Sequence, residues 1–151
     1  MSFYVTTPIY YVNAAPHLGH SYTTIIADAL ARWHRLLGED VHFLTGTDEH
    51  GLKMSQTAAK EGMSPRALAD RNAARFVEMV EVLGLSNDDF IRTTEPRHYE
   101  ACAELWRRME KAGDIFKKKY GGWYSVRQEA YFKEAERELR EGVRVETQNG
   151  T

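Results

Sequence analysis

Two histidines flank a leucine and a glycine in the segment His17-Leu18-Gly19-His20, close to the amino terminus. In a helix the two imidazoles would share one face, because residues three apart are neighbours there. Gly19 adds no side chain, so a flat base or sugar can approach the backbone beside them. Nucleotide binding is the chemistry that this arrangement favours. Surface histidines and ligands of an adventitious metal are the alternatives that these four residues leave open.

The histidine segment is expected to lie where a strand gives way to a helix. Residues 3–7 form a short β-rich run that Pro8 ends, and the helical spacing of apolar residues begins at His17. Open α/β sheets bind ligands at the carboxyl ends of their strands. A helix N-terminus also presents free N–H groups and a partial positive charge, which attract phosphate. The position therefore strengthens the interpretation as a nucleotide site.

Strand-like and helix-like segments alternate along residues 1–113. After the first strand, an amphipathic helix is expected at residues 17–37 and a strand at residues 41–45. The later segments are helices at residues 54–60, 64–83 and 96–112 and a strand at residues 90–92. Strands that alternate with helices predict an α/β fold with a Rossmann-like parallel sheet and right-handed crossovers.

The pattern changes after Gly113. Residues 115–125 contain a lysine run and the pair Gly121-Gly122, which predicts a hairpin instead of another crossover. A charged helix is expected at residues 133–140, and the hairpin-turn signal Asn149-Gly150 is followed by a single residue, so the chain is expected to be cut within a motif. We therefore expect a Rossmann-like half-domain at residues 1–113 and the start of an inserted unit at residues 114–151.

The composition describes an ordinary soluble globular protein. Of the 151 residues, 42% are hydrophobic and 28% charged, and the formal net charge is -2. No apolar run approaches the roughly 20 residues that span a bilayer, so we expect cytoplasmic residence without membrane association. The balanced charge predicts weak non-specific binding to nucleic acid. The single cysteine, Cys102, cannot form an internal disulfide and is interpreted as a small structural residue of a helix.

Three blocks of the sequence resemble the methionyl-tRNA synthetases, which belong to the class I aminoacyl-tRNA synthetases. Residues 4–20 are similar to the H-I-G-H region of that family, with residues 17–20 as the tetrapeptide itself. Residues 43–51 resemble the segment after the second strand, and residues 88–95 match a third block. The resemblance covers nearly the whole chain in order. It implies the amino-terminal part of an ATP-dependent ligase that activates methionine to methionyl-adenylate and transfers it to tRNA(Met).

The resemblance also implies roles for individual residues. Those implied for methionine binding are Ile9, Tyr11 and Asp48, those implied for ATP binding are Asn13, His17, Gly19 and His20, and His50 is a further residue that lines the site. A branched side chain and an aromatic ring can hold a thioether, and a carboxylate can pair with the substrate ammonium. Turn residues are the alternative interpretation of Tyr11 and Asp48.

The first reaction implied by the resemblance is attack of the methionine carboxylate on the α-phosphorus of ATP, which enters with Mg²⁺. This step needs no protein nucleophile, so His17 and His20 are expected to act by positioning and charge stabilisation. A second family signature, K-M-S-K-S, is absent. The likeness of Lys53-Met54-Ser55 to it is interpreted as a coincidence at the start of a helix. The chain by itself is therefore expected to be incomplete and inactive.

Zinc is not expected, although many members of the family carry a zinc knuckle in the inserted connective peptide. Ser125 and Gln128 stand where that knuckle has its first two cysteines, and neither side chain replaces a thiolate. The remaining histidines, His34, His42 and His98, show no shared ligand spacing and are interpreted as packing or surface residues. The lysines at residues 117–119 are interpreted as a solvated basic run, with contact to tRNA phosphates as the alternative.

Two other functions compete with the ligase. A free-standing nucleotidylyltransferase also uses an H-x-G-H turn, but the block at residues 45–51 argues against it. A non-catalytic module that binds amino acid or nucleotide is the third alternative, because half an active site can bind without turnover. The expected partners are methionine, ATP and tRNA(Met), and no protein partner is expected.

Overall fold

The structure, a computed structural model, describes residues 1–125, 130–132 and 146–147. The chain forms two compact units, Met1–Arg108 and Met109–Thr151. The first unit holds the parallel sheet and the helices that pack on it. The second unit holds a small antiparallel sheet.

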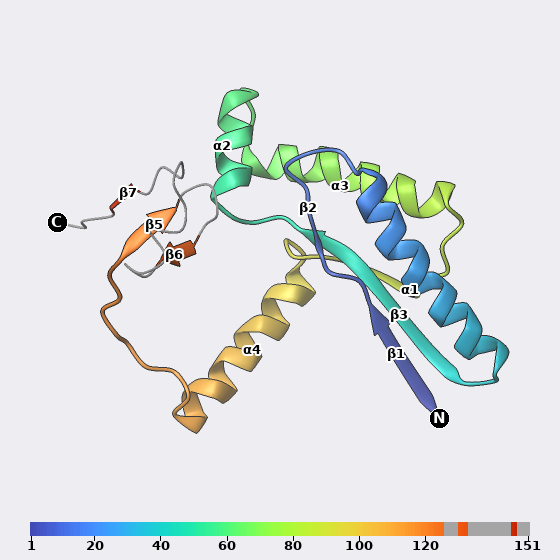
Figure 1. The fold of residues 1–151 in the computed structure, drawn as a ribbon. Coiled ribbons are helices and arrows are strands. Elements are labelled where there is room, and N and C mark those ends of the chain that lie inside the picture. Colours follow the sequence, from blue (N-terminus) through green and yellow to red (C-terminus); the bar gives the residue numbers. More distant parts are fainter. Residues whose placement is uncertain (126–129, 133–145, 148–151) are drawn as a thin grey trace. The chain divides into compact units, whose positions relative to one another are not determined.

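The sheet of the first unit is parallel throughout. Its strands are β1 (Ser2–Thr6), β2 (Tyr10–Tyr11), β3 (Asp40–Asp48) and β4 (Asp89–Arg92). Leu44 of β3 pairs with Thr6 on one side and with Asp89 on the other, so β3 is central (Figure 1). The predicted parallel α/β sheet is confirmed. The central strand is longer than the predicted residues 41–45, because polar residues at both of its ends also join the ladder.

The short strand β2 was not predicted, and it continues the edge that β1 begins. Three residues separate Thr6 from Tyr10, whereas two separate their partners Leu44 and Thr47, so the edge contains one extra residue. Pro8 lies in this interruption and cannot donate a ladder hydrogen bond. The irregular stretch therefore ends at β2, which returns the chain to the side of β3 beside Thr47 and Asp48.

Four helices follow the predicted order. They are α1 (Leu18–Leu36), α2 (Leu52–Lys60), α3 (Pro65–Val82) and α4 (Pro96–Ala112). At the start of α3, the Ser64 hydroxyl accepts a hydrogen bond from the Ala67 N–H at 3.1 Å, and Pro65 occupies the first turn. Gly84 adopts a φ of 60° just after α3, a conformation that favours glycine. The predicted cap and stop of this helix are confirmed.

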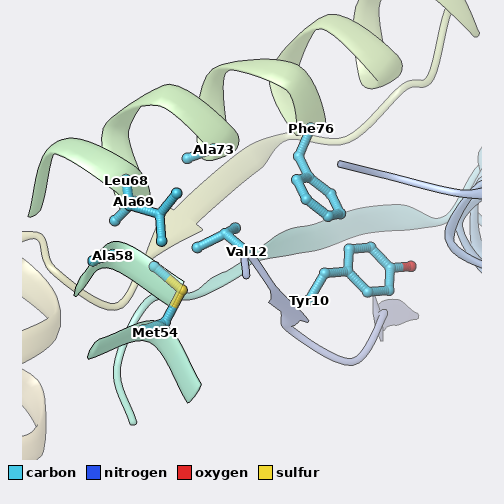
Figure 2. Close-up of a cluster of buried hydrophobic side chains, with 8 residues drawn as sticks. All are labelled: Tyr10, Val12, Met54, Ala58, Leu68, Ala69, Ala73 and Phe76. Atoms are coloured by element: carbon cyan, nitrogen blue, oxygen red, sulfur yellow. The ribbon is translucent and has the colours of Figure 1, made fainter. Parts of the chain in front are cut away.

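Two hydrophobic clusters hold these elements together. Side chains from β2, the following loop, α2 and α3 form the larger cluster, which comprises Tyr10, Val12, Met54, Ala58, Leu68, Ala69, Ala73 and Phe76 (Figure 2). Asn72 of α3 donates to the Val12 carbonyl at 2.6 Å, which ties the loop after β2 to the same helix. Because β2 and its loop are anchored by this core, the segment that leads to His17 has a defined path.

The second cluster shows which face of α1 packs on the sheet. Ala27 and Ala31 pack against Phe43, with Val5 and Val41 at the margin. The large apolar residues of the helix instead lie on its exposed side, and they are Tyr22, Ile25, Ile26, Leu30 and Trp33. The predicted helix is confirmed. Its most hydrophobic stripe does not cover this sheet, because the small alanines allow α1 to approach β3 closely.

The second unit contains an antiparallel sheet of β5 (Trp123–Ser125), β6 (Ala130–Phe132) and β7 (Glu146–Thr147), with β5 between the other two. The change to antiparallel pairing was predicted. Its partner was predicted wrongly, because β5 pairs with Ala130–Phe132 and not with residues before the glycine pair. The predicted helix at residues 133–140, the Asn149-Gly150 turn and Gln128 lie outside the described residues.

Substitution of Gly46 is expected to destabilise the parallel sheet. Gly46 pairs with Ile91, and a Cβ on Gly46 would lie 2.0 Å from the Ile91 carbonyl oxygen. Gly46→Ala must therefore push β3 and β4 apart, at a cost of about 2 kcal/mol or more. Denaturant unfolding measures this loss. Gly121→Ala is the control, because a Cβ there meets no atom within 4 Å, and equal midpoints for the two variants would contradict the prediction.

Candidate active site

The predicted methionine-binding residues lie together at the carboxyl end of the sheet. Tyr11 of β2 is paired in register with Asp48, the last residue of β3. Tyr11 is 57% exposed and Ile9, two residues earlier, is 43% exposed. Tyr10 and Val12 alternate with them and are buried in the core. The strand thus presents an apolar residue, a ring and a neighbouring carboxylate outward, where a ligand can reach them.

The two histidines cap the N-terminus of α1 with each other's help. His17 Nδ1 accepts from the Gly19 N–H at 3.1 Å, and His20 Nδ1 accepts from the His17 N–H at 3.1 Å. A ring nitrogen that accepts carries no proton, so each neutral imidazole holds its proton on Nε2. The ring centroids are 3.8 Å apart. The cap therefore fixes both tautomers and leaves two Nε2–H donors for a ligand.

Gly19 is required for this cap. A Cβ at Gly19 would lie 3.0 Å from His17 Cε1 and 3.1 Å from its Nδ1, which is tighter than ordinary contact. A larger residue would displace the His17 ring. The absent side chain thus makes room for the imidazole, and the predicted role of Gly19 beside a nucleotide stays a prediction. Asn13 lies half-buried in the loop between β2 and this cap.

His20 is held neutral by its surroundings. Its ring packs edge-on against Tyr10 at 4.8 Å and Phe76 at 5.1 Å between centroids. Burial lowers the pKa of His20, and the neighbouring His17 lowers it further. The Tyr10 hydroxyl shares a 2.8 Å hydrogen bond with Thr24, which fixes the ring beneath the histidine. His20 is therefore suited to donate a hydrogen bond without carrying a charge of its own.

This environment predicts a pH dependence of stability. The folded-state pKa of His20 lies below its unfolded value of about 6.5, so only the unfolded state takes up the proton between the two values. The free energy of unfolding should fall as pH drops through that window and be fully retained above it. Between pH 7.5 and pH 5, the free energy of unfolding should fall less steeply with decreasing pH in His20→Gln than in the unsubstituted protein. His42→Gln, on an exposed position of β3, is the control, and equal slopes for all three proteins would refute the assignment.

A buried ion pair is formed by Glu49, the residue that follows Asp48 at the end of β3, with Arg92 of β4. The Glu49 carboxylate accepts from Arg92 Nε at 2.6 Å and Arg92 Nη2 at 2.9 Å, from the Thr47 hydroxyl at 2.8 Å, and from the Thr94 hydroxyl. Burial raises the pKa of Glu49, but the hydrogen bonds from Arg92, Thr94 and Thr47 outweigh burial and hold the pKa below its usual value. Glu49 is therefore an ionised carboxylate inside the fold.

His50 is tied to neighbouring elements, not placed alone at the edge of the site. Its Nε2 lies 3.3 Å from the Thr93 carbonyl oxygen and 3.2 Å from the Tyr99 hydroxyl. Its backbone N–H lies 3.4 Å from Asp48 Oδ1. The structure thus brings the His50 backbone next to Asp48, while its ring contacts the start of α4, and the lining role of His50 stays a prediction.

Glu49 and Arg92 were not predicted as site residues from the sequence. A glutamate after a strand and an arginine in the next strand are common surface residues, and the two are 43 positions apart in the sequence. The signal that was available is that both lie within blocks of the resemblance, each close to the end of a predicted strand of the parallel sheet. The helix-start interpretation of Lys53-Met54-Ser55 is confirmed, because these residues lie in α2 and Met54 is 2% exposed in the core.

Within the described residues, no three histidine, cysteine, aspartate or glutamate side chains gather as a metal site. Ser125 is buried in β5.

None of the described helices is both long and apolar enough to cross a membrane.

Comparison with known families shows to which family the chain belongs. The family described as tRNA synthetases class I (M) matches residues 3–148. The chain belongs to this family of class I tRNA synthetases. The predicted Rossmann-like fold of the synthetase chain is thereby confirmed, and the match argues against a free-standing nucleotidylyltransferase.

Curated relatives and a solved structure agree with the family match. The synthetase chain is 63% identical over 145 residues to a methionine–tRNA ligase of Mesorhizobium japonicum, covering 95% of this chain and 28% of the relative. It is 56% identical over 149 residues to that of Mycobacterium bovis, covering 99% of this chain and 29% of the relative. Mycobacterium tuberculosis methionyl-tRNA synthetase in complex with methionyl-adenylate superposes with a TM-score of 0.84 at 58% identity, over 89% of this chain and 26% of that one. The synthetase chain thus spans less than a third of these proteins.

Proposed function

We propose that this chain supplies part of the active site of a methionine–tRNA ligase, the part that holds methionine and the phosphates of ATP. The observation that carries the proposal is the pairing of Tyr11 with Asp48, together with the contact of the preceding residue, Tyr10, with His20 of the capped N-terminus of α1. One edge of the sheet would thereby offer an amino-acid site and a phosphate site next to each other. Relatives named methionine–tRNA ligase and a similar structure with bound methionyl-adenylate support it.

On the amino-acid side, Asp48 would accept hydrogen bonds from the ammonium group of methionine. Ile9 and Tyr11 would contact the thioether, whose polarisable sulfur packs well against a ring. Both side chains are exposed in the chain as it stands, so a ligand can cover them without displacing core residues. A charge-assisted hydrogen bond fixes the ammonium, and the apolar contacts select the side chain.

On the phosphate side, the Nε2–H groups of His17 and His20 and the N-terminus of α1 would stabilise charge on the α-phosphate as the carboxylate attacks. Asn13 would add a polar contact. We expect ATP to enter as its Mg²⁺ complex, because Mg²⁺ is bound largely through substrate phosphates and water. The reaction forms one phosphorus–oxygen bond and releases pyrophosphate, and the chain provides positioning rather than a nucleophile.

Zinc is not part of the proposal. Ser125 stands in β5 where a zinc-binding relative would have a cysteine. Cys102 is exposed in α4, 23 positions before Ser125 in the sequence. Metal analysis of protein purified without chelator should therefore find no stoichiometric zinc after dialysis. Zinc retained at one equivalent would show that other residues form a site.

The function is tested by amino-acid-dependent exchange of pyrophosphate into ATP, catalysed by the complete synthetase that contains this chain. Methionine should support exchange, while leucine and isoleucine, which lack the thioether, should support it weakly. Charging of tRNA(Met) should follow, with tRNA as the third substrate. Exchange that does not depend on any amino acid would contradict the proposal, and binding without exchange would favour a non-catalytic module.

A further inference from the structure

The most enclosed charge in the described residues is not one of the predicted ligand-binding groups. The Glu49 side chain is 0% exposed, and Arg92, which grips it with two hydrogen bonds, is 23% exposed. Thr47 and Thr94 donate to the remaining acceptor positions of the carboxylate. Every contact is made by a residue near the end of β3, at the end of β4 or in the turn after β4, so the ion pair joins the carboxyl ends of two adjacent strands.

These contacts immobilise the backbone on both sides of Asp48. Thr47, which precedes it, pairs in the sheet with Tyr10 on one side and Arg92 on the other, and its hydroxyl donates to Glu49. Glu49, which follows it, donates its N–H to the Thr93 hydroxyl at 2.9 Å. Asp48 itself is half-buried and takes no part in the ion pair. Its carboxylate is therefore carried by a backbone that other residues hold in place.

The arginine also anchors the strand ends to a helix. Arg92 Nη2 donates to Asp70 of α3 at 2.5 Å, and Asp70 accepts from Arg66 at 3.1 Å. A guanidinium suits this position because its planar fork binds two carboxylates in fixed directions. A lysine at residue 92 would keep the charge and lose that geometry.

We propose that the Glu49–Arg92 ion pair is a positioning device that aims Asp48 at the ammonium group of methionine, an inference that rests on the proposed function. Neither residue of the pair touches the substrate. The pair acts by fixing the strand end, so that the carboxylate of Asp48 is in place before methionine arrives. Preorganised groups bind more tightly than groups that must be ordered by the ligand.

A double-mutant cycle in the complete synthetase tests this coupling. Glu49→Gln keeps the shape of the side chain and removes its charge. It should raise the dissociation constant of methionine by about five-fold or more when Asp48 is present. In an Asp48→Ala background the same substitution should change that constant by less than about two-fold, because no carboxylate remains to be aimed. The dissociation constant of ATP should be unaffected in both backgrounds.

The control is Asp89→Asn. Asp89 belongs to another arginine–carboxylate pair and lies at the start of β4, the strand that ends at Arg92. Arg97 holds Asp89 with hydrogen bonds of 2.5 and 3.0 Å, so the two pairs are alike in chemistry and differ in position. Asp89→Asn should leave methionine affinity unchanged. An equal loss in Asp89→Asn and Glu49→Gln would overturn the inference.

Two further results separate the explanations. If Glu49→Gln weakens methionine binding by the same factor with and without Asp48, the ion pair affects binding independently of Asp48 and the inference fails. If the unsubstituted enzyme shows no methionine-dependent exchange, the proposed function fails instead. Should Glu49→Gln not fold, Thr94→Val removes one hydrogen bond from the same carboxylate, and its smaller loss should likewise vanish in the Asp48→Ala background.

Discussion

The 151-residue chain by itself is expected to show methionine-dependent pyrophosphate exchange at least about 100-fold below that of the complete synthetase. The chain spans 28% of the Mesorhizobium japonicum relative, and the lysine-bearing K-M-S-K-S signature is not among its residues. Loss of a single charge-stabilising group costs roughly 10²- to 10³-fold in rate. The contribution of that signature to the pyrophosphate leaving group would be missing altogether.

Exposed apolar faces give a second reason for low activity of the isolated chain. Large apolar residues are exposed on two helices. They are Tyr22, Ile25, Ile26, Leu30 and Trp33 of α1 and Leu105, Trp106 and Met109 of α4. Apolar patches of this kind usually mark contact surfaces. Exchange should be measured alongside circular dichroism, so that a folded chain with no exchange is distinguished from an unfolded one. Robust exchange by the folded chain would contradict the prediction and favour a compact nucleotidylyltransferase-like enzyme.

His17→Ala and His20→Ala in the complete synthetase are expected to lower the rate of adenylate formation by roughly 10²- to 10³-fold each. Each substitution removes one Nε2–H donor and half of the reciprocal cap of α1. Methionine affinity should change by less than about two-fold, because the ring donors are expected to face the phosphates. Single-turnover kinetics with saturating methionine measures the rate.

The matched control for the two histidine variants is His34→Ala, at the other end of α1. His34 stacks on Phe3 with centroids 3.5 Å apart and contacts Glu39, so its loss perturbs packing without touching the site. Its adenylation rate should stay within about three-fold of the unsubstituted enzyme. A comparable loss in all three variants would mean that the histidines at the N-terminus act only through the stability of the helix.

Local signals predicted most of the fold. The Ser64-Pro65 start of α3 and the Gly84 stop depend on residues next to them in the chain, so the sequence was sufficient. The alternation of strands and helices likewise predicted a parallel sheet, which then placed the histidine segment at its carboxyl edge. The predicted site residues Tyr11 and Asp48 proved to be direct neighbours in the sheet.

Features that depend on distant residues were not predicted. The strand β2 is held by the core around Phe76 and by Thr47, not by its own two residues. The face of α1 that is buried on the sheet is the one with Ala27 and Ala31, because these small residues pack closely. It is not the face with the largest apolar side chains. The Glu49–Arg92 pair joins two strands and appears only once their register is known.

Asp48→Ala in the complete synthetase tests whether this edge of the sheet holds methionine beside the phosphates of ATP. Pre-steady-state adenylate formation by the complete synthetase, followed across methionine concentrations, yields both the methionine dissociation constant and the rate at saturation. Loss of one charge-assisted hydrogen bond, about 1.5 to 3 kcal/mol, should raise the dissociation constant roughly ten- to a hundred-fold and affect the saturated rate much less. Unchanged methionine affinity in Asp48→Ala would contradict the account.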